Sequence, residues 1–154
     1  MTREQWLEIL PWRNDPSVYI WSKTNRVIGA EEHLVWYEKR KSYLDREPLF
    51  AYFDGESLVG MSRLDLTSPH TYEVGLIVNP RLRGFGYGKA ILRDNCIFLS
   101  DTKYVNFDIL AYIHIENLFS LNLFESCGFV KESRIGCFEV LKWVRPPFVV
   151  NAQE

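Results

Sequence analysis

The 154-residue sequence has few of the side chains that build disulfide frameworks and metal sites. It contains three cysteines and three histidines, and neither set has a paired or clustered spacing. An odd number of cysteines argues against a disulfide framework, and scattered histidines give a zinc ion no local set of ligands. We therefore expect no metal site and free, buried thiols. The residues concerned are Cys96, Cys127 and Cys137, and His33, His70 and His114.

Long apolar runs and an excess of one charge are also missing. No stretch approaches the roughly 20 apolar residues of a membrane span, and the polar residues 2–8 do not resemble a secretory signal. Lys and Arg number 18 against 20 Asp and Glu, a formal net charge of −2. The chain thus lacks the basic surface that binds nucleic acid or an anionic membrane. We expect a cytoplasmic protein with neither partner.

What the sequence does have is material for a core and a surplus of aromatic rings. Hydrophobic residues make up 47% of the chain and aromatic residues 15%, which favours a globular protein over a disordered or fibrous one. The length suits one domain spanning residues 1–154, because domains commonly have about 100–150 residues. The aromatic surplus fits either a core or the wall of a binding pocket.

The first third of the chain predicts two helices. A capping-box pattern at Thr2–Gln5 predicts a helix to about residue 12, which Asn14-Asp15-Pro16 ends. No regular structure is expected for the aromatic residues 19–21. A second helix is expected over residues 30–44, with an inward stripe formed by Leu34, Tyr37, Lys41 and Leu44.

From Pro48 onward the pattern alternates between strands and helices. The Asp54-Gly55 pair predicts a hairpin turn between two strands, and the apolar run 72–78 predicts a strand covered on both faces. This order favours a mixed α/β (α+β) sheet flanked by helices over a regular doubly wound fold. Strands are expected at 49–53, 58–66, 72–78, 104–112, 129–134 and 138–144, and helices at 86–99 and 117–126.

A glycine-rich turn follows the strand 72–78 and leads into the next helix. Gly84, Gly86 and Gly88 alternate there, and amides without Cβ obstruction at a helix N-terminus suit a pyrophosphate. A P-loop would need glycine at Arg83 and a hydroxyl at Ala90. A dinucleotide fingerprint would need the spacing G-x-G-x-x-G. Neither matches, which leaves another pyrophosphate site or a purely structural turn.

Two motifs resemble those of the GNAT superfamily of acetyl-CoA-dependent N-acetyltransferases. The stretch Arg83–Gly88 resembles its R/Q-x-x-G-x-G/A pyrophosphate loop. A second signature, N-x-x-A/S followed by Y-E-x-x-G-F, is similar to Asn117, Ser120, Phe124, Glu125, Gly128 and Phe129. The resemblance implies the GNAT fold, with a central, mostly antiparallel sheet that splays where acetyl-CoA binds, and places the acetyl-CoA-binding motifs within residues 72–129.

The resemblance also implies which residues contact acetyl-CoA. The pyrophosphate would lie on the amides of the glycine turn, and the pantetheine would pair with strand backbone in a gap between the strands 72–78 and 104–112. The implied cofactor-binding residues are Leu76, Ile77, Val78, Arg83, Gly84, Phe85, Gly86, Tyr87, Gly88, Asn117, Ser120 and Phe124.

Glu73 is the candidate general base for deprotonating an acceptor amine. It lies in an apolar strand, where an unpaired carboxylate is costly, and the family often places a base near this point. The alternative is an ordinary solvated residue at a strand end. Phe124 stands where the family usually has the tyrosine that protonates the leaving thiolate, so Tyr87, Tyr112 or water would have to serve as acid.

The amino-terminal residues 1–47 would form the acceptor side. The patterns Trp12–Pro16 and Glu31–Trp36 resemble those of GNAT enzymes that acetylate nucleotide-linked amino sugars, including the N-acetyltransferase of the pseudaminic-acid pathway. Arg13, His33 and Trp36 are then candidate substrate-binding residues, although a helical histidine is more often a core residue. Family members usually begin with a strand before the first helix. Without it, the sheet edge stays bare or is covered by a second copy in a homodimer.

These observations predict an N-acetyltransferase that moves the acetyl group of acetyl-CoA to a primary amine. The acceptor we favour is the amino group of a UDP-linked deoxy-amino sugar of surface polysaccharide synthesis. A protein N-terminal acetyltransferase of the ribosomal-protein type is an alternative, since similar amino-terminal patterns occur there. A catalytically silent CoA-binding module is a third, because Phe124 lacks a hydroxyl.

Overall fold

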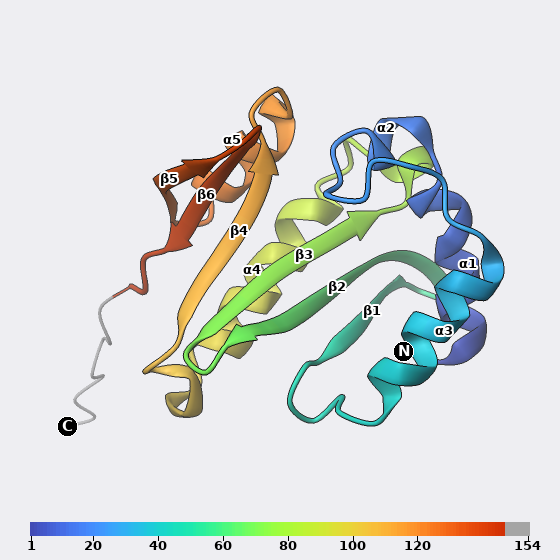
Figure 1. The fold of residues 1–154 in the computed structure, drawn as a ribbon, viewed down its shortest axis with the longest axis horizontal. Helices are drawn as coiled ribbons and strands as arrows, with labels where there is room; N and C mark the ends of the chain where they lie inside the picture. Colours follow the sequence, from blue (N-terminus) through green and yellow to red (C-terminus); the bar gives the residue numbers. More distant parts are fainter. Residues whose placement is uncertain (147–154) are drawn as a thin grey trace.

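The computed structural model describes residues 1–146, in which six strands form a single mixed sheet (Figure 1). Neighbouring strands pair antiparallel except β3 and β4, which run parallel. This arrangement confirms the predicted α+β class with a mostly antiparallel sheet. In spatial order the strands are β1 (Leu49–Asp54), β2 (Ser57–Ser68), β3 (Thr71–Val78), β4 (Asp108–His114), β6 (Phe138–Trp143) and β5 (Phe129–Ile135).

The sheet splits between its two central strands. β3 and β4 pair only where Thr71–Glu73 meets Asp108–Leu110, and beyond that point the two strands diverge (Figure 1). From Val74 onward the β3 backbone is paired with β2 on one side and not with β4 on the other. Unpaired backbone groups in a sheet need partners, so the open edge of β3 is available to a ligand.

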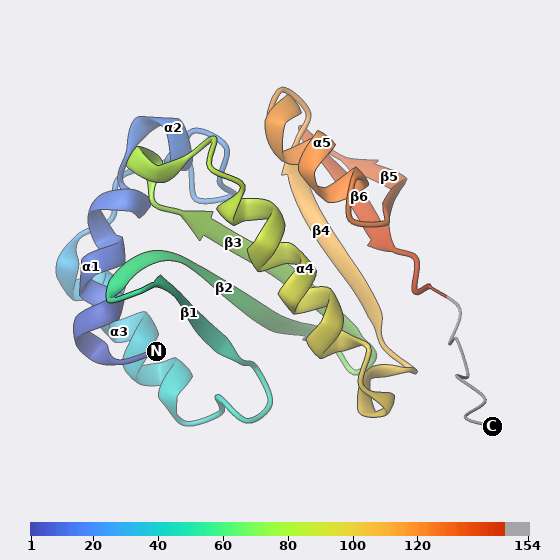
Figure 2. The same cartoon turned by 180° about the vertical axis from the view of Figure 1, so that it is seen from behind.

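Two groups of helices lie against opposite faces of the sheet. α4 (Tyr87–Leu99) and α5 (Leu118–Glu125) cover the face turned to the viewer in Figure 2. α1 (Arg3–Arg13) and α3 (Ala30–Lys41) pack on each other beside the other face of β1 and β2. Short helical turns complete the fold: α2 (Pro16–Tyr19) and the 3₁₀ turns Pro80–Leu82 and Thr102–Tyr104.

Each helix group builds its own hydrophobic core. Alternation along β2 directs Leu64 to the α4 side and Met61 to the α1 side. The larger core, between the sheet and α4 and α5, includes Val74, Leu92, Leu99, Ile109, Ala111, Leu121, Phe124, Phe129 and Leu141. The smaller one joins Trp6, Ile9 and Trp12 of α1 to Tyr37, Leu49, Leu58 and Met61.

The prediction of which α3 residues face the core was wrong by about one position along the helix. Its buried residues are His33, Tyr37 and Arg40, whereas Lys41 is exposed and Leu34 half-buried. Two polar side chains face inward because each finds partners there: His33 bonds to α1, and Arg40 bonds to the Leu64 carbonyl at 2.7 Å and ion-pairs with β2. α3 also ends at Lys41 instead of about residue 44.

Two further boundaries differ from the predictions. Residues 16–19, for which no helix was predicted, form α2, and Asp15 caps this helix by accepting from the Ser17 amide. Strand β4 begins at Asp108, four residues later than expected, because Tyr104 is buried among the rings of Tyr72, Phe98 and Phe107 below the sheet. The predicted strand end at Val144 lies one residue beyond β6, and residues 147–154 are outside the described part of the chain.

Candidate active site

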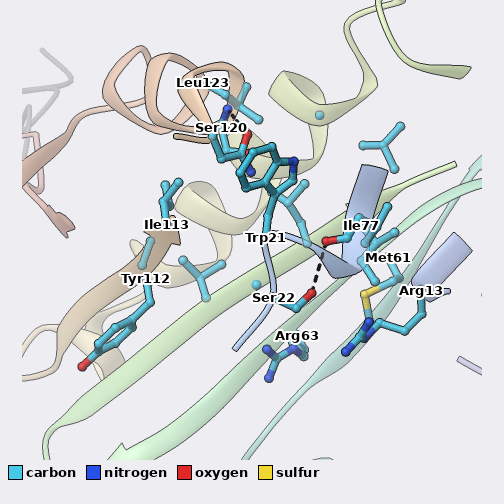
Figure 3. Close-up of a pocket in the computed structure, with 18 of the residues that line it drawn as sticks. Arg13, Trp21, Ser22, Met61, Arg63, Ile77, Tyr112, Ile113, Ser120 and Leu123 are labelled. Carbon is cyan, nitrogen blue, oxygen red and sulfur yellow. Dashed lines mark hydrogen bonds between the residues drawn. The ribbon is translucent and has the colours of Figure 1, made fainter. Parts of the chain in front are cut away.

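A cavity of about 990 Å³ joins the gap between β3 and β4 to the space beneath α1 and α3 (Figure 3). It brings together the two halves of the predicted site. The lining includes Glu73, Leu76, Ile77, Val78, Arg83, Gly84, Gly86, Tyr87, Gly88, Asn117, Ser120 and Phe124, and also Arg13, His33 and Trp36. Phe85 is the exception among the predicted residues, because its side chain is 75% exposed and lies outside this lining.

The glycine turn at one end of the cavity is shaped for an anion. Gly84 and Gly86 adopt φ values of +84° and +87°, a conformation that favours glycine. Gly86 is the N-cap of α4, and among the described residues no side chain caps this helix. The free amides of its first turn, with the positive end of the helix dipole, therefore face an open site that suits a pyrophosphate.

Gly88 has a different role, because the lack of a side chain there lets α4 pack close to α5 and β3. A Cβ at this position would lie 3.3 Å from Leu123 of α5 and 3.6 Å from the Val78 side chain. Asn117 caps α5 by accepting a 3.2 Å hydrogen bond from the Ser120 amide. Together these contacts fix α5 beside the turn, so the residues of both motifs border one cavity. The open β3 edge, the turn and α5 are the elements to which the resemblance assigns acetyl-CoA binding.

A general acid would have to lie near Phe124, the residue at the family's acid position, or be one of the two candidate tyrosines. Phe124 is 5% exposed and packs edge-on against the Phe129 ring at 5.0 Å. The Tyr87 hydroxyl donates a 2.5 Å hydrogen bond to Asp54 at the end of β1, and this bond raises the pKa of Tyr87. A hydroxyl held by a carboxylate is a poor proton donor to another group. This leaves Tyr112 of β4, which also lines the cavity, and water as candidates.

Glu73 is buried at the point where the sheet splits, with 9% of its surface exposed. It is the last residue of β3 that pairs with β4. Its two carboxylate oxygens accept from the Lys23 ammonium at 2.8 and 2.7 Å, and that ammonium also lies 3.7 Å from the centre of the Tyr112 ring. The buried carboxylate is thus paired and not merely solvated, and its partner is an amine.

The cavity floor beside Glu73 is formed by alternate residues of β2. Asp65 lies directly opposite Glu73, and Arg63 directly opposite Gly75. Two facing carboxylates repel, and here each has its own cation: Asp65 contacts Arg63 and ion-pairs with the buried Arg40 at 2.5 Å. Carboxylate and guanidinium groups therefore alternate on this floor.

Gly75 makes room for the Arg63 guanidinium. A Cβ on Gly75 would lie 3.1–3.3 Å from the Arg63 guanidinium atoms, a distance at which one of the two groups has to move. The absence of a side chain therefore lets the guanidinium lie flat across β3. Burial and the neighbouring cations Arg40 and Arg13 lower the pKa of Arg63, and Glu73 acts in the opposite direction.

Arg13 enters the same part of the cavity from the end of α1 (Figure 3). Its Nη2 donates to the Thr24 carbonyl at 2.8 Å, whereas its buried Nη1 has no hydrogen-bond partner among the described residues. Burial is the main cause that lowers the pKa of Arg13. A buried, unused guanidinium donor near Arg63 is a feature that an anionic ligand group would satisfy.

Segment 20–29, which connects α2 to α3, passes over these residues. The Asn14 side chain fixes it by bonding both backbone groups of Ile28, at 2.8 and 2.9 Å. Trp21 extends from it into the cavity, and the Trp21 and His114 ring centres are 5.1 Å apart (Figure 3). The segment thereby places Trp21 and Lys23 across the splayed strands.

His33 and Trp36 line the cavity wall through a stack of rings. Trp6 lies between them, with ring centres 4.1 Å from His33 and 4.8 Å from Trp36. His33 Nε2 is 2.6 Å from the Trp6 carbonyl, which can only accept, and Trp6 Nε1 donates to the His33 carbonyl at 2.8 Å. Burial lowers the pKa of His33. Its ring is committed to joining α1 and α3, while the half-buried Trp36 is the better placed to meet a ligand.

Sequence reasoning missed Lys23, Trp21, Arg63 and Asp65. A signal for the last two existed: Arg63 and Asp65 alternate with Leu64 and Leu66 in a strand that the apolar pattern already placed in the sheet, and charges on the inner face of a central strand are uncommon. No comparable signal marks Lys23, because its position depends on the path of an irregular segment.

The fold and the cavity are those of an acyl-CoA-dependent N-acyltransferase, and a family model described as Acetyltransferase (GNAT) family matches residues 6–129. The chain belongs to this family. It is 33% identical over 98 residues to the uncharacterized N-acetyltransferase YfmK of Bacillus subtilis, a match covering 63% of each chain. It is 26% identical over 121 residues to acetyltransferase PseH of Campylobacter jejuni, covering 79% of this chain and 74% of the relative.

Solved structures show the same fold at low sequence identity. Spermidine N-acetyltransferase from Vibrio cholerae, in complex with CoA and spermine, superposes with a TM-score of 0.73 at 19% identity, over 92% of this chain and 89% of that one. PseH from Campylobacter jejuni superposes with a TM-score of 0.71 at 20% identity, over 95% and 93%. Within residues 1–146, no group of three or more His, Cys, Asp and Glu side chains could hold a metal ion, and no helix has the length and apolarity needed to cross a membrane.

Proposed function

We propose that this protein transfers the acetyl group of acetyl-CoA to a primary amine carried by an anionic small molecule. The observation that carries the proposal is one continuous cavity with the glycine turn at one end and Glu73, Arg63 and Arg13 at the other. The turn suits the pyrophosphate of the donor. The second end offers a carboxylate for the amine and two guanidinium groups for a negative charge.

The chemistry required of the protein is limited. An acceptor amine attacks a thioester only when it is neutral, so its proton has to be removed. Glu73 is buried next to the strand gap and already holds an ammonium group, as a base for this step should. Alignment of amine and thioester supplies much of the rate. The leaving thiolate would take its proton from Tyr112 or water, since Phe124 has none to give.

The acceptor we favour is the amino group of a UDP-linked deoxy-amino sugar. The resemblance of the amino-terminal patterns to enzymes acting on nucleotide-linked amino sugars supports it. So do the free Arg13 donor and the adjacent Arg63, because guanidinium groups bind phosphates in a bidentate manner. The rings of Trp21 and Trp36 border the same cavity and could stack on a base or sugar face.

The unused Arg13 donor favours an anionic acceptor over a polyamine. The fold neighbour from Vibrio cholerae was solved with spermine, a polycation with no group that can accept from Arg13 Nη1. A peptide α-amine for protein N-terminal acetylation carries no fixed negative charge next to the amine. Its carbonyl oxygens can accept from Arg13, but they lack the charge that a phosphate supplies.

The test is an acceptor panel read by mass spectrometry. The protein would be incubated with acetyl-CoA and UDP- and TDP-linked amino sugars, spermidine, and peptides with free N-termini. We expect acetylation of a nucleotide-linked amino sugar and thermal stabilisation by it. Preferential acetylation of a peptide or of spermidine would contradict the acceptor class. Binding of acetyl-CoA with no transfer to any amine would contradict the enzymatic function and indicate a silent CoA-binding module.

Replacing Arg63 by glutamine is expected to raise the KM for the acceptor about tenfold, since a charge-assisted contact contributes roughly 1.5–3 kcal/mol. The KM for acetyl-CoA should change little. Asp65 keeps its ion pair with Arg40 in this variant, so the fold should persist. Arg93→Gln, at an exposed position on α4, is the matched control. An Arg63→Gln effect confined to acetyl-CoA would contradict the assignment.

A further inference from the structure

The Lys23 amine already occupies the position that an acceptor amine would need. It is bound by both oxygens of Glu73 and lies over the face of Tyr112. An ammonium group between a carboxylate and an aromatic face is held by charge and by a cation–π contact. The proposed general base thus has an amine of the protein itself as its partner.

The geometry places this amine at the opening of the strand gap. Glu73 is the last residue of β3 paired with β4, where its partner is Leu110, and Tyr112 comes two residues later on β4. Lys23 Nζ therefore contacts one side chain from each of the two strands just where they separate. A donor substrate whose pyrophosphate lies at Gly84–Gly86 and whose arm follows the open edge of β3 would direct its thioester toward this opening.

Lys23 can also reach this position and leave it. Its side chain is 50% exposed, whereas that of Glu73 is 12% exposed. It belongs to the irregular segment 20–29, which is hydrogen-bonded to the end of α1 through the backbone of Thr24 and Ile28. The lysine enters from solvent and is not part of the packed core, so an incoming acceptor can displace it.

We propose that Lys23 is a modification site for the protein's own acetyl transfer: in the absence of acceptor, Lys23 Nζ is acetylated in cis by acetyl-CoA. This inference rests on the proposed function. Glu73 takes one proton from the Lys23 ammonium, and the neutral nitrogen attacks the thioester carbonyl. A C–N bond forms, the C–S bond breaks, and the thiolate takes up the second proton, which the nitrogen loses as it becomes an amide. The products are Nζ-acetyllysine and CoA thiol, with one proton released to solvent.

Acetylation of Lys23 would change the site. The amide carries no charge, so it cannot form the ion pair with Glu73 or the cation–π contact with Tyr112. Glu73 would then be free to accept from an external amine. The modified protein is therefore expected to differ from the unmodified one in its KM for the acceptor.

The experiment is site-resolved mass spectrometry of the purified full-length protein with acetyl-CoA and no acceptor. We expect Lys23 to gain one acetyl group at least about 100-fold faster than the exposed Lys41 of α3, because the amine is held at the site. The rate constant should not change when the protein is diluted, since the reaction is intramolecular. Lys23→Arg keeps the positive charge and should abolish the modification, and Lys41→Arg should leave it intact. Glu73→Gln should slow it.

Three other outcomes would contradict the inference, and the last of them would also contradict the proposed function. Acetylation of Lys23 and Lys41 at similar rates would show ordinary chemical acetylation and overturn the inference. Transfer to a panel acceptor with Lys23 unmodified would also overturn it, while leaving the proposed function intact. Donor binding without transfer to Lys23 or to any acceptor would overturn the proposed function as well.

Discussion

Replacing Glu73 by glutamine is expected to lower kcat by about 100-fold or more, because general base catalysis contributes roughly 10²–10⁴-fold. Glutamine has nearly the same shape but cannot take a proton from the acceptor amine. The Kd for acetyl-CoA should change little, since Glu73 lies at the split of the sheet and the glycine turn proposed to bind the pyrophosphate is at the other end of the cavity. Steady-state kinetics and calorimetry of donor binding measure the two quantities.

Two comparisons separate a loss of the base from a loss of the ion pair. Lys23→Gln removes the partner of Glu73 while keeping the carboxylate, and it should retain most of kcat. Glu132→Gln, at an exposed position on β5, controls for the substitution itself. A Glu73→Gln variant with unchanged kcat, or wild-type kcat/KM that does not vary between about pH 6 and 9, would contradict the assignment.

Replacing Gly86 by valine is expected to weaken acetyl-CoA binding about 30-fold, the equivalent of roughly 2 kcal/mol of backbone strain. Gly86 has a φ of +87° at the N-cap of α4, a conformation that a β-branched residue avoids. The variant would relieve the strain by moving the turn out of the left-handed region. The amides that should meet the pyrophosphate would then point elsewhere. Calorimetric titration with acetyl-CoA measures the loss.

Gly136→Val provides the matched control for this prediction. Gly136 has a φ of +58° in the turn between β5 and β6, and a Cβ added there, as at Gly86, would meet open space among the described residues. The same strain should lower the melting temperature of both variants. Only the Gly86 variant should lose donor affinity. Equal donor affinity in the two variants would contradict a role of the turn in binding acetyl-CoA.

Local patterns predicted much of the fold because the physical cause was itself local. The capping box at Thr2 and Gln5 is present, and the hairpin turn forms at Gly55, with φ of +59°. The glycine turn leads from β3 into α4 as expected. In each case a few neighbouring residues determine the backbone conformation, through a hydrogen bond between them or through the freedom of glycine.

The errors arose where distant partners decide burial. Arg40 faces inward because it pairs with the Asp65 carboxylate and donates to the Leu64 carbonyl, both on β2. A prediction that counts only apolar residues on a helix face cannot identify such a buried arginine. Tyr104 leaves the predicted strand because rings from β3 and α4, together with that of the nearby Phe107, surround it. Tertiary contacts override local preference in both places.

The sequence by itself determined the strand, glycine turn and helix of the proposed donor side. From a net charge of −2 it also predicted no nucleic-acid or membrane partner. The tertiary structure decided which charged side chains meet on the proposed acceptor side. There Lys23, Arg63 and Glu73 are brought together from positions up to 50 residues apart, and only the packing of segment 20–29 against the splayed strands gives the carboxylate its amine. Short-range hydrogen bonds are encoded by neighbours in the chain, whereas charge pairing across a cavity depends on the completed fold.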